Sequence, residues 1–210
     1  MKFCIIGLGR FGYQVANSLA DNGMDIVGVD MNESIIDSIK DKITQPICMK
    51  INDEEDLKSI GADEMDTVIV AMGDFAQSIL ITALLKRKLH VPTVITRSVS
   101  PIHKEILNLV GADQVVLPEQ EVAKRLADTL SLPFKSLIQI TPDFGISQIQ
   151  AKESLVGSQV KDIEDTYEVK CIAKKTNDEV LLISESYIIK AKDNLIISGN
   201  NRNLAKIAKL

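Results

Sequence analysis

The sequence of 210 residues lacks many of the features on which common functional classes depend. It contains no tryptophan, only two histidines and three cysteines, and aromatic residues make up 4% of it. The cysteines are widely spaced among apolar neighbours, so they form neither a zinc-binding pattern nor a disulfide framework, and a reducing cytoplasm is their natural setting. Because aromatic side chains are so few, a hydrophobic content of 45% indicates an aliphatic core, which is typical of parallel α/β sheets.

Positive charge and long apolar runs are also scarce. The net charge of -5 gives no overall basic footprint for nucleic acid, so we expect no nucleic-acid partner. The most apolar stretch, residues 78–85, ends at Lys86 and falls well short of the roughly 20 residues that cross a membrane. Lys2 is followed at once by a strand-like run, which argues against a signal peptide. These absences predict a cytoplasmic protein.

The opening residues, by contrast, contain a dinucleotide-binding motif. An apolar run is followed by Gly7, Gly9 and Gly12, and Asp30 ends a second apolar run. In this motif the first glycine permits a tight turn, the second lets the backbone approach a pyrophosphate, and the third lets the next helix pack on the strand. Asp30 is placed to accept hydrogen bonds from ribose hydroxyls and would repel a 2′-phosphate. The motif therefore predicts ATP, ADP or NAD(H) as ligand in preference to NADP.

The first part of the chain alternates strand-like and helical patterns. We expect strands at 2–6, 25–29, 46–49, 67–71, 93–96 and 114–117. This alternation predicts a Rossmann-like, doubly wound parallel sheet with right-handed crossovers, whose ligand lies at the carboxyl ends of the strands. The candidate binding residues directly follow these strands. They are Gly7, Gly9, Arg10, Phe11, Gly12, Asp30, Met31, Asn32, Met72, Gly73, Asp74, Arg97, Ser98, Val99 and Glu119.

The pattern changes after about residue 130, which predicts a second and smaller domain. Residues 131–133 end a helix, and residues 141–145 form a turn signal. We therefore expect a nucleotide-binding domain at 1–130, a linker at 131–140 and a β-rich α+β domain at 141–210. The strands expected in this last domain are 146–151, 169–173, 180–184 and 195–198, followed by a helix from Asn201.

Catalytic groups are hard to find in the chain. A dehydrogenase needs a proton donor or acceptor beside the nicotinamide, and the small domain contains no histidine. We find no serine, histidine and aspartate order and no cluster of metal ligands. We therefore expect a protein that is not an enzyme. The alternative is a small NAD-dependent oxidoreductase or a redox-sensing Rossmann protein.

Three stretches resemble the N-terminal domain of the RCK family, the regulators of potassium conductance. They are residues 5–12, residues 67–73, and Gly111 to Asp113 leading to Leu117-Pro118-Glu119; the β-rich tail resembles the family's C-terminal domain. One copy of each domain is more similar to the Ktr-type cytosolic subunit than to the Trk-type one. The resemblance implies a gating-ring subunit that binds nucleotide and controls a potassium-translocating membrane protein. It also implies dimers that assemble into an octameric ring at the inner face of the membrane.

The resemblance also implies roles for individual residues. Arg10 would clamp phosphate, Lys50 and Ile51 would lie beside the adenine, and His103 and Glu119 would lie near the γ-phosphate. Glu119 would be a ligand for a divalent cation, and Arg97 stands where the family has a lysine. His103 and Glu119 have plainer explanations as well. His103 can be a polar surface residue in the first turn of a helix, and an acid after Pro118 is favoured by the helix dipole.

Overall fold

The computed structural model describes residues 1–131, 136–141, 143–177 and 179–209 of the chain. The chain divides into two compact units, Met1–Glu121 and Val122–Leu210, and each is described by itself. The segment expected to be a linker, 131–140, contains a strand at Ser136–Gln139, while residues 132–135 lie outside the described part. Pro142, in the expected turn at 141–145, also lies outside it.

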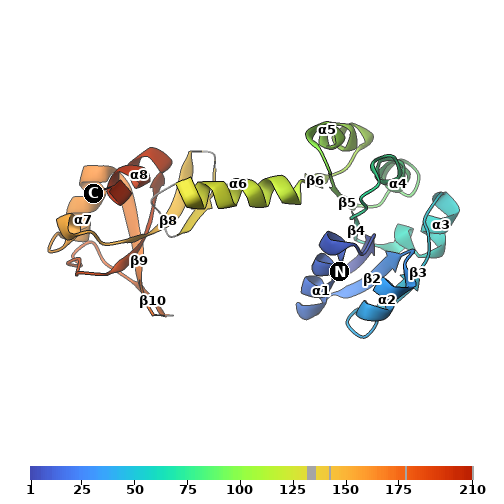
Figure 1. Cartoon of the computed structure of the whole chain (residues 1–210), viewed down its shortest axis with the longest axis horizontal. Coiled ribbons are helices and arrows are strands. Elements are labelled where there is room, and N and C mark those ends of the chain that lie inside the picture. Colours follow the sequence, from blue (N-terminus) through green and yellow to red (C-terminus); the bar gives the residue numbers. More distant parts are fainter. Residues whose placement is uncertain (132–135, 142, 178, 210) are drawn as a thin grey trace. The chain divides into compact units, whose positions relative to one another are not determined.

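The first unit is built on a six-stranded sheet in which every pair of neighbours is parallel (Figure 1). Its order, β3-β2-β1-β4-β5-β6, reverses direction at β1, so the switch point lies between β1 and β4. The predicted Rossmann-like sheet is confirmed, and each strand lies within about one residue of its predicted range. The strands are β1 (Lys2–Ile6), β2 (Asp25–Asp30), β3 (Gln45–Cys48), β4 (Thr67–Val70), β5 (Thr93–Arg97) and β6 (Gln114–Val116).

Helices connect these strands, and their starts follow from capping residues. Asn32, Asp53, Asp74 and Ser100 each accept a hydrogen bond from a backbone N–H in the first turn of the helix that follows. The helices are α1 (Arg10–Asp21), α2 (Glu33–Ile39), α3 (Glu54–Ser59), α4 (Phe75–Arg87), α5 (Pro101–Val110) and α6 (Pro118–Ser131), with a short 3₁₀ turn at Ala62–Glu64.

The core of this unit is aliphatic, as its composition predicts. Successive residues of β1 alternate between two clusters: Cys4 and Ile6 pack with Val68 and Val70, whereas Ile5 packs with Ile26 and others. Since neighbouring side chains of a strand point to opposite faces, the sheet is buried on both sides. Burial raises the pKa of the Cys4 thiol to about 12, so this cysteine is an inert core residue.

The second unit is an antiparallel sheet of five strands in the order β10-β9-β11-β8-β7. The expected β-rich domain is thus confirmed, including the helix that starts at Asn201. A further helix at Val160–Tyr167 was not predicted. The elements are β7 (Ser136–Gln139), β8 (Phe144–Gln150), β9 (Val169–Thr176), β10 (Glu179–Leu182), β11 (Asn194–Asn200), α7 (Val160–Tyr167) and α8 (Asn201–Lys209), with a 3₁₀ turn at Glu153–Leu155.

Both α7 and α8 contribute to the core of the second unit, where Ile163 and Leu204 pack in one cluster with Leu195 and Ile197 of β11. Across the ranges that the structure describes, no helix combines the length and the apolar character needed to cross a bilayer.

Candidate functional site

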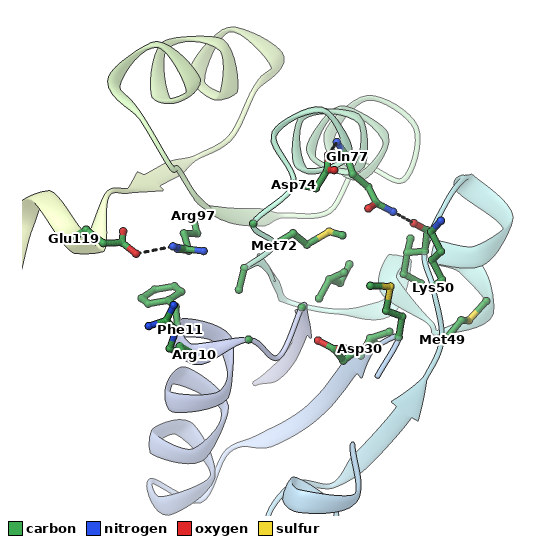
Figure 2. Close-up of a pocket in the computed structure, with 18 residues that line it drawn as sticks. Arg10, Phe11, Asp30, Met49, Lys50, Met72, Asp74, Gln77, Arg97 and Glu119 are labelled. Atoms are coloured by element: carbon green, nitrogen blue, oxygen red, sulfur yellow. Dashed lines mark hydrogen bonds and ion pairs between the residues drawn. The ribbon is translucent and has the colours of Figure 1, made fainter. Parts of the chain in front are cut away.

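A cavity of about 620 Å³ opens at the carboxyl ends of the strands in the first unit (Figure 2). Most of the predicted residues line it: Gly7, Gly9, Arg10, Phe11, Asp30, Met31, Lys50, Ile51, Met72, Gly73, Asp74, Arg97 and Glu119. The predicted residues outside this lining are Gly12, Asn32, Ser98, Val99 and His103. The residues that line it without having been predicted are Ile6, Val29, Met49, Ala71 and Gln77.

The cavity has two ends with different chemistry. Figure 2 shows Arg10, Arg97 and Glu119 on one side, which we call the arginine end. On the opposite side lie Met49, Lys50 and Gln77, together with Ile51, whose carbonyl oxygen accepts a hydrogen bond from Gln77. We call this side the glutamine end. The carboxylate of Asp30 lies between the two.

The glycine turn brings α1 very close to the sheet. Gly7 has a φ of +91°, a conformation that favours glycine. A Cβ on Gly12 would lie only 1.9 Å from the carbonyl oxygen of Gly7, so this position requires glycine for packing. A Cβ on Gly9 would meet nothing within 4 Å. Gly9 therefore leaves open space in front of the helix, whereas Gly12 lies behind the cavity and holds the helix in place.

The N-terminus of α1 has the features that an anion-binding site requires. Its N-cap is Gly9, which offers no side-chain acceptor, while α2, α4 and α5 are capped by Asn32, Asp74 and Ser100. The first backbone N–H groups of α1 therefore have no side-chain cap, and they carry the positive end of the helix dipole. With Arg10 as the first helical residue, this is the arrangement that binds phosphate in other nucleotide sites.

Asp30 links the end of β2 to the glycine turn. Its Oδ2 accepts a hydrogen bond of 2.7 Å from the backbone N–H of Leu8, and its Oδ1 accepts one of 2.9 Å from that of Asn32. Each carboxylate oxygen has a second lone pair, so both can also accept from a ribose hydroxyl. Asn32 itself is occupied as the cap of α2, where its Oδ1 accepts from the N–H of Ser34.

At the arginine end, Nη2 of Arg97 donates a hydrogen bond of 2.6 Å to Oε1 of Glu119. The pKa of Glu119 is lowered, first by a hydrogen bond from its own backbone N–H at the start of α6 and then by Arg97. Glu119 is therefore ionised near neutral pH. The Nε–H of Arg97 is buried and has no hydrogen-bond partner among the described residues. Arg97 thus retains a donor beyond the ion pair.

A metal site cannot be built from protein groups alone in the described ranges. No three histidine, cysteine, aspartate or glutamate side chains come together there. A cation at Glu119 would need most of its oxygen ligands from phosphate and water, which is how Mg²⁺ binds in many nucleotide sites.

His103 lies in the interior and does not line the cavity. Its Nδ1 accepts a hydrogen bond of 3.2 Å from the N–H of Val99, and its Nε2 lies 2.9 Å from Oγ of Ser78. Since a backbone N–H can only donate, the ring proton is on Nε2 and points to Ser78. The ring centroid lies 4.3 Å from that of Phe75, and burial lowers the pKa of His103. The interpretation of His103 as a polar surface residue is therefore wrong.

Ser98 and Val99 complete the loop that follows β5. Ser98 is buried and its Oγ donates to the carbonyl of Ser100, while Val99 is exposed and presents its N–H to His103. These residues shape the loop after Arg97 and do not line the cavity.

Gln77 also lines the cavity, but it lies in a helix and does not directly follow a strand. It lies in the first turn of α4, three residues after Asp74, whose Oδ1 accepts from the Gln77 N–H. A first turn at the carboxyl edge of a parallel sheet faces the ligand site as the strand ends do. This position in the sequence is the signal that would have identified it.

The parallel sheet, the glycine turn and the acid that ends β2 define a nucleotide-binding Rossmann-type domain. Residues 3–118 match the family described as the TrkA-N domain, and the chain belongs to this family. The chain is also similar over nearly its whole length to the Ktr system potassium uptake proteins C and A of Bacillus subtilis (strain 168). Identity is 27% to protein C, covering 99% of this chain and 96% of that protein, and 26% to protein A, covering 98% and 94%.

These relatives are named for potassium uptake and not for a catalysed reaction, which agrees with the expectation that the chain is not an enzyme. The expected membership of the RCK family is confirmed by the same similarities and by the folds of solved structures.

Two solved structures share the fold. One is described as the GsuK channel bound to NAD, with a TM-score of 0.55, 18% identity and coverage of 99% of this chain and 38% of that one. The other is GsuK bound to ADP, with a TM-score of 0.51, 23% identity and coverage of 61% and 33%.

Proposed function

We propose that this chain is a nucleotide-binding regulatory subunit that controls a potassium-translocating membrane protein. The similarity to two Ktr potassium uptake proteins over nearly the whole chain supports the transport role. The partner would be a membrane subunit, as the potassium uptake role of these relatives implies. The chain would act in the cytoplasm, at the inner face of the membrane.

The observation that carries the nucleotide assignment is the N-terminus of α1, which has no side-chain cap and which shares the cavity with Arg10 and Arg97. Backbone N–H groups, Arg10 and Arg97 supply donors for a pyrophosphate, and Asp30 supplies acceptors for the adjoining ribose. This order of groups fits ATP, ADP and NAD(H). Structures of GsuK with NAD and with ADP support the same ligand classes.

The regulatory step in this proposal is differential binding, in which the nucleotide is not consumed. A ligand shifts a conformational equilibrium only by the difference in its affinity for the two states. Glu119 is paired with Arg97, so a ligand that reaches Arg97 competes with this carboxylate. A divalent cation bound to the γ-phosphate of ATP would take Glu119 as a ligand. ADP has no γ-phosphate, so its phosphates would not reach Glu119.

The proposed assembly is a homo-oligomer in which dimers form an octameric ring. Large apolar side chains on the helices of the first unit support further contacts, since Leu80, Ile102 and Leu109 are exposed by 47%, 58% and 78%. Light scattering at micromolar concentration tests this part, and a strictly monomeric chain would contradict it.

Calorimetric titration with ADP, ATP and NADH tests the nucleotide site. Arg10→Gln should weaken binding of all three nucleotides, because it removes the guanidinium at the start of α1. Arg202→Gln, at an exposed position of α8, is the matched control and should leave binding unchanged. Potassium flux through a reconstituted partner should then depend on the nucleotide present. Steady turnover of ATP or NADH by the purified chain would contradict a purely regulatory role.

A further inference from the structure

The glutamine end of the cavity contains one polar side chain whose orientation is fixed. Nε2 of half-buried Gln77 donates a hydrogen bond of 2.5 Å to the carbonyl oxygen of Ile51. A carbonyl oxygen can only accept, so this bond determines which end of the amide faces Ile51. The second Nε2 hydrogen and Oε1 remain available, and Figure 2 shows the amide oxygen turned away from Ile51.

The place of Gln77 relative to the proposed ligand follows from the order of the strands. The glycine turn follows β1, Asp30 ends the neighbouring β2, and Met49 follows β3 at the edge of the sheet. A nucleotide with its phosphates at the glycine turn and its ribose at Asp30 therefore extends its base toward Met49 and Ile51. Gln77 reaches this same end of the cavity from the first turn of α4.

The surroundings of the base would be apolar apart from Gln77 and Lys50. Met49 and Met72 are partly buried and pack against the aliphatic core, and Ile51 is 3% exposed. Thioether groups make favourable contacts with aromatic rings of many kinds, so they hold a base without distinguishing one from another. Selection among bases then depends on the polar group at the edge of the ring.

We propose that Gln77 determines specificity for adenine by hydrogen-bonding to its 6-amino group. Oε1 accepts a hydrogen bond from the 6-amino group, and the free Nε2 hydrogen donates to the adjacent ring nitrogen, a bidentate pairing that suits an amide and adenine. Guanine carries an oxygen at position 6, which would oppose Oε1. The inference rests on the proposed nucleotide site and adds its base specificity.

The first test changes the ligand and leaves the protein intact. Binding of ADP, GDP and purine riboside 5′-diphosphate, which has hydrogen at position 6, is measured by calorimetry on the full chain. ADP should bind about tenfold to a hundredfold more tightly than either of the others. Equal affinity for ADP and either competitor would overturn the role of Gln77, whereas no binding of any of the three would overturn the nucleotide site itself.

The second test changes the amide. Gln77→Met keeps the length of the side chain and removes both polar atoms, so ADP should lose about tenfold in affinity while purine riboside 5′-diphosphate stays within about twofold. Gln114→Met, at an exposed position of β6, is the matched control and should change neither. An equal loss for both ligands in Gln77→Met would show that Gln77 only supports the cavity wall, and would overturn the proposal.

Discussion

Nη2 of Arg97, at the end of β5, lies 2.6 Å from Oε1 of Glu119, at the start of α6, so one of the two arginines that line the cavity is held in an ion pair. The glutamate side chain is 68% exposed and the arginine 21%. An exposed partner in such a pair contributes little to stability, because solvent screens it. The pair is therefore better suited to exchange for a ligand than to hold the fold together.

The first prediction concerns this pair. Glu119→Gln should leave ADP affinity intact or raise it, since Arg97 no longer has a carboxylate partner, and should reduce the structural response to ATP with a divalent ion. Small-angle scattering profiles with each nucleotide, in wild type and variant, check this. Equal responses of the wild type to ATP and ADP would contradict it.

The second prediction concerns Asp30. Asp30→Asn keeps an oxygen acceptor for one of the two backbone N–H groups but removes the charge and one acceptor, so ADP binding should weaken by about 1–3 kcal/mol. The same change should narrow the preference for NADH over NADPH, because the carboxylate no longer repels the 2′-phosphate. Calorimetry with ADP, NADH and NADPH measures both effects, and an unchanged ratio of NADH affinity to NADPH affinity would exclude Asp30 from ribose recognition.

The third prediction separates packing from binding within the glycine turn. Gly12→Ala should lower the free energy of unfolding by about 1–3 kcal/mol, because the new methyl group meets the carbonyl of Gly7. Gly9→Ala should change that free energy by less than about 0.5 kcal/mol, since the backbone there has a φ of -64° and open space. It should nevertheless weaken ADP binding about tenfold, because the methyl group stands where the pyrophosphate approaches.

Urea denaturation and calorimetry on the two glycine variants provide the comparison. If Gly9→Ala unfolded as easily as Gly12→Ala, the distinction between the two positions would be lost.

The fourth prediction concerns pH and His103. Burial lowers its pKa from the ordinary 6.5, so below pH 6.5 the unfolded chain takes up a proton that the folded protein excludes. The free energy of unfolding should therefore fall as the pH drops through this window, by at most about 1.4 kcal/mol per pH unit. Denaturation at pH 7.5, 6.5 and 5.5 measures the slope.

His103→Gln should flatten this slope, and His90→Asn, at an exposed histidine, should retain it. A slope that persists in His103→Gln would assign the pH dependence to other groups.

The strands of the first unit were predictable because each contains a short apolar run between helical patterns, and one of them, Thr67–Val70, is buried at every position. The helix at Val160–Tyr167 is harder to predict. Val160 and Ile163 recur at helical spacing, but the segment has only eight residues, which include two aspartates, a glutamate and a lysine. So short a helix is stabilised mainly by its packing on β9 and α8.

Some residues of the site could likewise be predicted from the sequence, and others could not. Gly7, Arg10 and Asp30 follow directly from the spacing of the motif, since strand ends in a parallel sheet meet at one edge. Gln77 lies in the first turn of α4, a position that the sequence offers but that a list restricted to strand ends omits. The burial of His103 depends on a contact with Ser78, 25 residues away, and no local sequence pattern contains that contact.

The missing side-chain cap of α1 also bears on how long the protein survives. If a phosphate completes this helix terminus, the ligand belongs to the hydrogen-bond inventory of the native state, and nucleotide supply becomes a determinant of turnover. A ligand present at about 100 times its Kd adds about 2.7 kcal/mol to the stability of the folded form. That increment is a substantial share of the roughly 5–15 kcal/mol by which most folded domains are stable. A fall in the nucleotide pool would then expose the glycine turn to proteolysis and reduce the number of subunits as well as their activity.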